Sequence, residues 1–267
     1  MEKVTAIVLA AGAGKRMHSA VRKQYMLLCS KPVLYYSLRA FQDCPFVDEI
    51  VLVTGQDEIA YCQEQFVEQY GFSKVHAVVA GGKERYHSVY EGLKACPDAA
   101  YVFIHDGARP LVDQETLMRA YTEVQACDAC VVGMPSKDTV KIADEEGNIS
   151  STPNRALVWT IQTPQVFSYP LVKKAYDMQM QQENVLITED AMWWRICWER
   201  RSGWWKVPMR ISRSRRRRTS RWRRRSWREK MLKKELTRND NDGNINDSSA
   251  KHSSSEIKSL KKGKESS

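Results

Sequence analysis

Short runs of apolar residues recur along the first 190 residues, and each is apolar along its whole length rather than at every second position. Such runs are typical of strands that are covered on both faces. They lie at Val4–Leu9, Glu49–Thr54, Val75–Ala80, Tyr101–His105 and Ala129–Pro135. Stretches typical of helices separate them, at Pro32–Gln42, Asp57–Tyr70, Arg85–Ala95 and Gln114–Gln125. This alternation predicts an α/β domain with a mostly parallel sheet and helices on both faces.

The same region contains a predicted arm that protrudes from the sheet. Val140–Ile142 and Asn148–Ser151 flank Glu146-Gly147, a pair suited to a hairpin turn. We place the domain at residues 1–192 and the arm at about 136–158. Ligands of such sheets bind outside the carboxyl ends of the strands, so the loops that follow these ends are the candidate sites.

The formal net charge of +10 is an average over two unlike parts of the chain. Residues 1–190 carry 18 Lys and Arg against 24 Asp and Glu, a net charge of −6, whereas residues 191–267 carry 24 against 8, a net charge of +16. Seven of the eight Trp lie between Trp193 and Trp227. Residues 193–238 form a Trp- and Arg-rich segment without helical or strand period, and the polar tail 239–267 is predicted to be irregular and disordered. The average charge is therefore no evidence for nucleic-acid binding.

The cysteines and the hydropathy pattern indicate a cytoplasmic protein. No run approaches the roughly 20 apolar residues of a membrane helix, which excludes an integral membrane protein. The 7 Cys are dispersed and odd in number, unlike a secreted disulfide framework. Cys127 and Cys130 form a lone CxxC, which we interpret as buried thiols rather than a redox or zinc site. Lys3 and the apolar residues after it imitate a signal peptide, but they are better explained as a buried strand that leads into a glycine loop.

The loop after the first predicted strand has the composition of a phosphate site. Its sequence is Ala10-Ala11-Gly12-Ala13-Gly14-Lys15-Arg16-Met17, in which small residues let backbone N–H groups close around an anion. It is not a Walker A loop, because Leu9 and Arg16 stand where that motif needs Gly and Ser or Thr. Met17 replaces the third Gly of a dinucleotide fingerprint. Taken alone, the loop could equally be a structural tight turn.

Four further motifs accompany this loop. A carboxylate at a strand end, such as Asp106, is where a Mg²⁺–phosphate complex is commonly held. A Gly pair lies between a strand and a helix, and a basic segment and a TPQ tripeptide stand elsewhere in the chain. The four motifs are Arg22-Lys23-Gln24-Tyr25, Gly81-Gly82-Lys83-Glu84-Arg85-Tyr86-His87-Ser88-Val89, His105-Asp106-Gly107-Ala108-Arg109-Pro110 and Thr163-Pro164-Gln165.

Together these motifs resemble those of the 2-C-methyl-D-erythritol 4-phosphate cytidylyltransferases of isoprenoid precursor synthesis. The pattern AAGxGxRM, KQY, GGxxRxxSV, HDxARP, DTVK and TPQ occurs in that order between residue 4 and about residue 192. The resemblance implies a Rossmann-like nucleotidyltransferase fold, Mg²⁺ dependence, a homodimer and transfer of CMP from CTP to methylerythritol phosphate with release of pyrophosphate. The ribitol-5-phosphate cytidylyltransferases share much of the pattern, but they typically show AGG at Ala10-Ala11-Gly12, and they remain the nearest alternative.

The resemblance also implies a role for each site residue. Fixed cations would stabilise the charge that develops on the phosphate oxygens and on the departing pyrophosphate. The family's arm exchanges between subunits, so its substrate-binding Arg would serve the partner's active site. His87 and His105 are expected to be structural, because an attacking phosphate needs no general base. The implied roles are catalysis for Arg16 and Lys23, CTP binding for Ala10, Ala11, Gly12, Gly14, Gly82, Ser88 and Asp106, methylerythritol phosphate binding for Arg155, Thr163 and Asp106, and a location near the metal for Asp106.

The chain departs from the family after about Met192. A segment with a pattern like VVEG, NIK and PEDL is expected there, with a Lys that faces the phosphates, but the chain is instead rich in Trp and Arg. Shifting the codons by one base permits V-E at Trp193–Arg195 and K-I-T-T-P-E-D-L at Ser212–Ser220. We therefore interpret the segment as ordinary coding sequence translated out of frame. On this interpretation the chain lacks that Lys and the last strand and helix of its domain, and its activity is weak or lost.

Two function classes outside the enzymes fit the chain less well. Arg213–Arg228, with Trp222 and Trp227 interleaved, could bind nucleic-acid phosphates and stack bases. Since this segment decodes into a different motif, we expect no specific nucleic-acid partner. A basic amphipathic helix at a membrane lacks the necessary period. The expected partners are therefore CTP, a polyol phosphate and a second copy of the chain.

Overall fold

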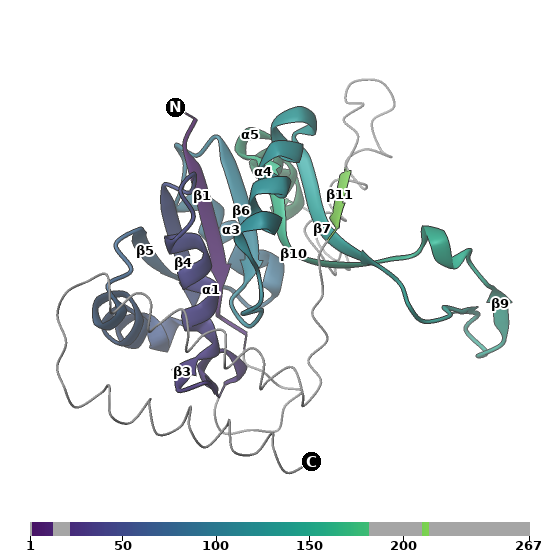
Figure 1. Cartoon of the computed structure of the whole chain (residues 1–267), viewed down its shortest axis with the longest axis horizontal. Helices are drawn as coiled ribbons and strands as arrows, with labels where there is room; N and C mark the ends of the chain where they lie inside the picture. Colours follow the sequence, from purple (N-terminus) through teal and green to yellow (C-terminus); the bar gives the residue numbers. More distant parts are fainter. Residues whose placement is uncertain (1, 13–21, 182–209, 214–267) are drawn as a thin grey trace, which may run out of the picture. The chain divides into compact units, whose positions relative to one another are not determined.

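The strand-forming runs assemble into one seven-stranded sheet. The computed structural model describes residues 2–12, 22–181 and 210–213 (Figure 1), all of which belong to the unit 1–216. The sheet has the order β11-β7-β10-β6-β1-β4-β5. β10 runs antiparallel to both of its neighbours, and the other neighbouring pairs are parallel, which confirms the mostly parallel sheet. The strands are β1 (Val4–Leu9), β4 (Glu49–Thr54), β5 (Val75–Ala80), β6 (Tyr101–Asp106), β7 (Ala129–Pro135), β10 (Trp159–Ser168) and β11 (Arg210–Arg213).

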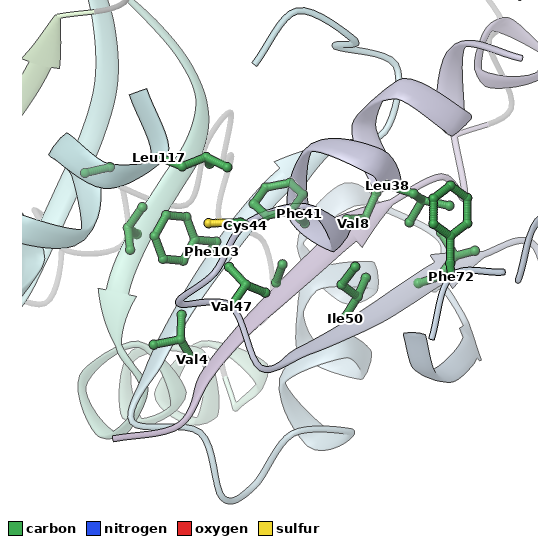
Figure 2. Close-up of a cluster of buried hydrophobic side chains, with 14 of the residues drawn as sticks. Val4, Val8, Leu38, Phe41, Cys44, Val47, Ile50, Phe72, Phe103 and Leu117 are labelled. Atoms are coloured by element: carbon green, nitrogen blue, oxygen red, sulfur yellow. The ribbon is translucent and has the colours of Figure 1, made fainter. Parts of the chain in front are cut away.

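Helices cover both faces of this sheet, as the uninterrupted apolar runs predict. Successive side chains of a strand point to opposite faces, so Ile50 of β4 belongs to the buried cluster that includes side chains of α1 and α4, while Val51 belongs to the cluster that includes side chains of α3 and α5. Figure 2 shows the first of these clusters, in which Phe41 lies among the strand side chains. Burying a side chain of that size stabilises the fold by about 1.5–3 kcal/mol. The helices are α1 (Val33–Gln42), α3 (Arg85–Lys94), α4 (Gln114–Cys127) and α5 (Tyr169–Met180).

Two elements of the β4–α3 region differ from the prediction. β5 is only half-buried, because it lies at the edge of the sheet rather than between two strands. The predicted helix at 57–70 is divided into a 3-10 turn, η3 (Gln56–Glu58), the short helix α2 (Ile59–Cys62) and a wider π-type segment, η4 (Gln63–Glu68).

β10 and α5 are not predicted by the sequence pattern. Pro164 lies inside β10, and a proline normally argues against a central strand because it cannot donate a ladder hydrogen bond. The register of β10 against β7 shifts between Ile161 and Gln165, so Pro164 lies at this irregularity. α5 follows directly and has Pro170 in its first turn, where the missing N–H costs no helical hydrogen bond.

The predicted arm is present and extends away from the sheet (Figure 1). It contains β8 (Ile142–Ala143), which pairs antiparallel with β9 (Ile149–Ser151), and the 3-10 turn η5 (Arg155–Leu157). Gly147 has a φ of +88°, a conformation that glycine adopts without a steric penalty, and it permits the hairpin turn. Large apolar side chains of the arm are exposed, including Ile149 at 65% and Leu157 at 79%.

Part of the expectation for the C-terminal region is wrong. The frame argument implied that the last strand of the domain is missing, yet Arg210–Arg213 form β11 parallel to β7, with Arg210 opposite Cys130. A ladder uses backbone groups, so an Arg-rich sequence can supply it. The remaining residues of the Trp- and Arg-rich segment and the polar tail lie outside the described residues. In the described part of the chain, no helix is both long and apolar enough to span a bilayer.

Candidate active site

The carboxyl ends of β1, β5 and β6 meet at one edge of the sheet. Leu9 is opposite Asp106 in the β1–β6 register, and the N–H of Gly107 donates to the Leu9 carbonyl at 2.8 Å. Gly81, after β5, lies against the β1 loop: a Cβ at this position would be 2.5 Å from the Cβ of Ala11. The close approach therefore requires glycine at this position, and it brings three loops that are distant in sequence into contact.

The KQY motif forms a turn that is anchored to the β1 loop. This turn, η2 (Lys23–Tyr25), buries Gln24, whose Nε2 donates to the carbonyls of Ala10 at 2.5 Å and of Gly12 at 3.3 Å. The hydroxyl of Tyr25 lies 3.2 Å from Thr54 Oγ1, and burial raises the pKa of this phenol. Gln24 and Tyr25 are thus directed inward, whereas Lys23 is exposed to solvent beside the loop.

The loop between β5 and α3 is fixed by its own hydrogen bonds. The N–H of Gly82 donates to Oγ of Ser88 at 3.2 Å, and this hydroxyl donates to the Glu84 carbonyl at 3.3 Å. The N–H of Glu84 donates to Nδ1 of His87 at 3.2 Å, which closes the first turn of α3. Gly82 and the buried Ser88 therefore lie together in a pre-formed loop beside Ala11, and His87 has a structural role.

Two arginines hold the carboxylate at the end of β6. Nε and Nη2 of Arg85 each donate to Oδ1 of Asp106 at 3.2 Å, and Nε of Arg109 donates to Oδ2 at 2.8 Å. Burial favours the neutral acid, but the two guanidinium groups outweigh it and lower the pKa of Asp106. Nη1 of Arg109 donates to Oε1 of Gln162 at 2.5 Å, which ties this cluster to β10.

Thr163 joins the same cluster from β10. Its hydroxyl accepts the N–H of Asp106 at 3.1 Å and lies 3.1 Å from Nδ1 of His105. Nε2 of His105 lies 3.2 Å from the Arg109 carbonyl. His105 is completely buried, and this burial lowers the pKa of its imidazole to about 4.

A cavity of about 180 Å³ opens beside this cluster. It presents two guanidinium groups against a single carboxylate, so its charge favours an anion such as a phosphate. Its lining residues are Arg85, Asp106, Arg109, Ile161, Gln162, Thr163 and Gln165. A larger hollow of about 490 Å³ lies at α5 and the loop before β6, at the amino end of that strand and outside the predicted site.

The described residues do not form a metal site of their own. Mg²⁺ takes six oxygen ligands, commonly one or two carboxylates completed by water and substrate phosphates. Both oxygens of Asp106 already accept from arginine, and the described part of the chain contains no group of three His, Cys, Asp or Glu that could hold a metal ion. We therefore do not assign Asp106 as a metal ligand.

Cys127 and Cys130 are both buried, and Cys127 donates to the Glu123 carbonyl.

The structure brings most of the predicted site residues to this one edge of the sheet. Arg155 lies elsewhere, exposed in η5 of the arm. Gly14 and Arg16 lie outside the described residues. Arg85, Arg109 and Gln24 belong to the motifs, but the sequence alone assigned them no role. The only signal for them was a basic or amide side chain in a segment that follows the end of a strand. The predicted residues at the edge are Ala10, Ala11, Gly12, Gly82, Ser88, Asp106 and Thr163, with Lys23 on the adjacent turn.

Comparisons with known proteins show which family this chain is similar to. Residues 4–200 match the family model of 2-C-methyl-D-erythritol 4-phosphate cytidylyltransferase. A protein of that name from Lachnoclostridium phytofermentans is 55% identical over 192 residues, which are 72% of this chain and 82% of that protein. One from Lachnospira eligens is 47% identical over 190 residues, 70% of this chain and 83% of that protein. The crystal structure of 4-diphosphocytidyl-2C-methyl-D-erythritol synthase from Anaerococcus prevotii is similar with a TM-score of 0.70 and 27% identity, over 87% of this chain and 96% of that one.

Proposed function

Because the chain belongs to the 2-C-methyl-D-erythritol 4-phosphate cytidylyltransferases, a family of nucleotidyltransferases, we propose that it transfers CMP from CTP to 2-C-methyl-D-erythritol 4-phosphate. The products are CDP-methylerythritol and pyrophosphate. The observation that carries the proposal is the close approach of Gly81 to Ala11 in the loop after β1 and to Ser88, beside a cavity lined by Arg85, Asp106 and Arg109.

In this proposal CTP occupies the loops and the acceptor occupies the cavity. Backbone N–H groups of Ala11 and Gly12 face the triphosphate, and the base lies against the loop of Gly82 and Ser88, in which Gly82 packs directly against His87. The acceptor phosphate attacks the α-phosphorus in line and expels pyrophosphate. Lys23, exposed beside the loop, stabilises the charge that develops, and Arg16 is proposed for the same task from outside the described residues.

The family resemblance also implies Mg²⁺. The described residues do not supply its ligands, so we propose that the ion arrives with the phosphates of CTP. When bound, it would neutralise charge on those phosphates. In this proposal, the transfer of CMP depends on the ion pairs of Asp106 with Arg85 and Arg109. It also depends on the positive charges of Lys23 and Arg16 at the β1 loop.

We propose further that the arm makes a homodimer. Its exposed apolar side chains would be covered by a second copy of the chain, and Arg155 would then enter the partner's acceptor site. Light scattering of the purified protein tests this: a dimer is expected, and Ile149→Asp should give monomers, whereas Glu145→Gln, a change at an exposed polar position of the same arm, should not. A monomeric wild-type protein contradicts the proposal.

Pyrophosphate release by the full chain tests the reaction. We expect release with CTP and methylerythritol phosphate, and none with ATP. Faster release with ribitol 5-phosphate would favour the alternative acceptor. Absence of release with either acceptor, by a protein that binds CTP, would contradict the proposed reaction for this chain.

The out-of-frame interpretation of residues after 192 remains a proposal. It is supported by the alignment with the Lachnoclostridium protein, which leaves almost a fifth of that protein unmatched. Sequencing the gene across codons 190–195 tests it directly. A version with the frame restored is expected to release pyrophosphate at least tenfold faster, in line with the loss of one preorganised charge; equal rates would contradict the functional part. All of the Arg-rich segment 213–228 but Arg213 lies outside the described residues, and no specific nucleic-acid partner is part of the proposal. The dispersed cysteines favour a reducing compartment, and a cytoplasmic location is part of the proposal.

A further inference from the structure

His105 is bonded at both ring nitrogens, and one partner fixes where its proton lies. Nε2 lies 3.2 Å from the backbone carbonyl of Arg109. A carbonyl oxygen can only accept, so Nε2 must carry a hydrogen and donate it. The other nitrogen, Nδ1, lies 3.1 Å from Oγ1 of Thr163.

The surroundings of His105 keep the ring neutral. Neither nitrogen has a carboxylate partner, the ring is completely buried, and Phe41 packs against it at 5.3 Å between ring centroids. Asp106, Arg85 and Arg109 are the charged groups nearby, and they form their own ion pairs. Burial lowers the pKa of His105 to about 4, in agreement with a neutral ring near neutral pH.

The neutral ring dictates the direction of the hydrogen bond to Thr163. Because Nε2 holds the hydrogen, Nδ1 is an acceptor, and the hydroxyl of Thr163 must donate its only hydrogen to it. The same hydroxyl accepts the backbone N–H of Asp106 at 3.1 Å. A hydroxyl has one hydrogen and two lone pairs, so Thr163 retains one lone pair and nothing to donate.

We infer that Thr163 faces the acceptor cavity as a hydrogen-bond acceptor only, and that it binds a hydroxyl group of the polyol rather than the phosphate. The inference deepens the proposed function and rests on it for the identity of the substrate. A phosphate dianion offers only acceptor oxygens, so it would oppose the remaining lone pair of Thr163, whereas a polyol hydroxyl can donate to it. Arg85 and Arg109, which line the same cavity, are the donors that suit the phosphate. His105 acts through Thr163 and is a positioning residue.

The first test reads the tautomer directly in the wild-type protein. Nuclear magnetic resonance of ¹⁵N-labelled histidine near neutral pH should show His105 with its hydrogen on Nε2 and an unprotonated Nδ1. A hydrogen on Nδ1, alone or in addition to the one on Nε2, overturns the inference. This measurement requires neither substrate nor turnover.

The second test separates the hydroxyl from the phosphate. Binding of methylerythritol phosphate and of inorganic phosphate is measured by calorimetry, in the presence of a CTP analogue with a methylene between the α and β phosphorus atoms. Thr163→Val should weaken methylerythritol phosphate about tenfold, in line with one lost hydrogen bond to a buried partner. It should leave inorganic phosphate within about twofold, and Thr163→Ser should restore polyol binding because it restores the hydroxyl.

The outcomes distinguish the inference from the function it rests on. An equal loss of affinity for inorganic phosphate and for methylerythritol phosphate in Thr163→Val overturns the inference alone. Failure of methylerythritol phosphate to bind the wild-type protein overturns both the proposed function and the inference about its hydroxyl. Melting of each variant is recorded beside binding, and if Thr163→Val does not fold, the ¹⁵N measurement on the wild-type protein decides the case: a hydrogen on Nε2 alone supports the inference, and a hydrogen on Nδ1 contradicts it.

Discussion

The side-chain amide of Gln24 donates to the backbone carbonyl of Ala10 at 2.5 Å, so a turn 14 residues along the chain is attached to the loop that follows β1. A second, longer hydrogen bond reaches the carbonyl of Gly12. The carbonyls of the loop are thus directed toward Gln24, and the N–H of Ala11, which points opposite to the carbonyl of Ala10 in a trans peptide, is directed away from it. Gln24 thereby orients the loop after β1 while its neighbour Lys23 stays exposed.

Gln24→Glu should weaken CTP binding, because a carboxylate cannot donate to the two carbonyls. We expect the Kd for CTP to rise at least tenfold, the equivalent of about 1.4 kcal/mol. Gln125→Glu, an exposed substitution on α4 with the same change in charge, should leave the Kd within about twofold. Calorimetric titration of the full chain with CTP gives both values, and equal affinities of the two variants would remove Gln24 from the site.

Gly81→Ala should disrupt the same loop by steric overlap. The new Cβ would lie 2.5 Å from Cβ of Ala11 and 2.6 Å from Oγ of Ser88. We expect a loss of stability of about 1–3 kcal/mol in denaturant titration, together with loss of CTP binding. Gly92→Ala is the matched control, because its Cβ would meet Ile7 at 2.5 Å in the core between the sheet and α3. It should destabilise the fold by a similar amount yet leave CTP bound below its melting temperature; a Gly81→Ala protein with normal CTP affinity would contradict the loop contact.

Asp106→Asn should release the two arginines and abolish most of the transfer activity. We expect pyrophosphate release to fall at least about tenfold, as removal of a preorganised charge partner does in other enzymes. The pKa of Asp106 is lower in the folded protein than in the unfolded chain, so its contribution to stability is full above about pH 4 and is lost as pH falls through the folded value. Thermal melting over this acid range should therefore change less with pH in Asp106→Asn than in wild type, and parallel curves for the two proteins would contradict the charge pairing.

His105 should contribute to acid destabilisation in a different pH window. Its pKa is about 4 when folded and 6.5 when unfolded, so between these values the unfolded chain binds a proton that the folded protein does not. Stability therefore falls as pH decreases from 6.5 to about 4, by about 3 kcal/mol for this group. His105→Gln should flatten this part of the curve. Denaturant midpoints at half-unit pH steps measure the effect, and a wild-type midpoint that is constant between pH 6.5 and 4 contradicts a buried neutral ring.

The strands that the sequence predicts and those that it misses differ in what stabilises them. Strands buried on both faces must be apolar throughout, so β1, β4 and β7 were predicted with the bounds that the structure shows. β10 was missed because it contains Pro164 and polar residues that suit its irregular register, and these do not make a strand pattern. β11 was missed because its position depends on backbone pairing with β7 rather than on its side chains.

The residues of the candidate site also fall into those that the sequence indicates and those that it does not. The family resemblance implied roles for Ala10, Gly82, Asp106 and Thr163 because these residues stand in the shared motifs; residue type and spacing alone left the first loop open to a structural explanation. Nothing in the sequence indicated that Gln24 bonds to the first loop, because this contact joins two segments through backbone carbonyls that any residue possesses.

By itself, the sequence determined the α/β class, the edge of the sheet where the candidate site lies and the order of the motifs, since burial and strand period act locally along the chain. Only the tertiary structure decided how polar groups pair across that edge: that Asp106 is shared between Arg85 and Arg109, and that His105 takes the hydrogen of Thr163. The physical reason is that a hydrogen bond depends on distance and direction between atoms brought together by folding, and neither is encoded in residue type or spacing.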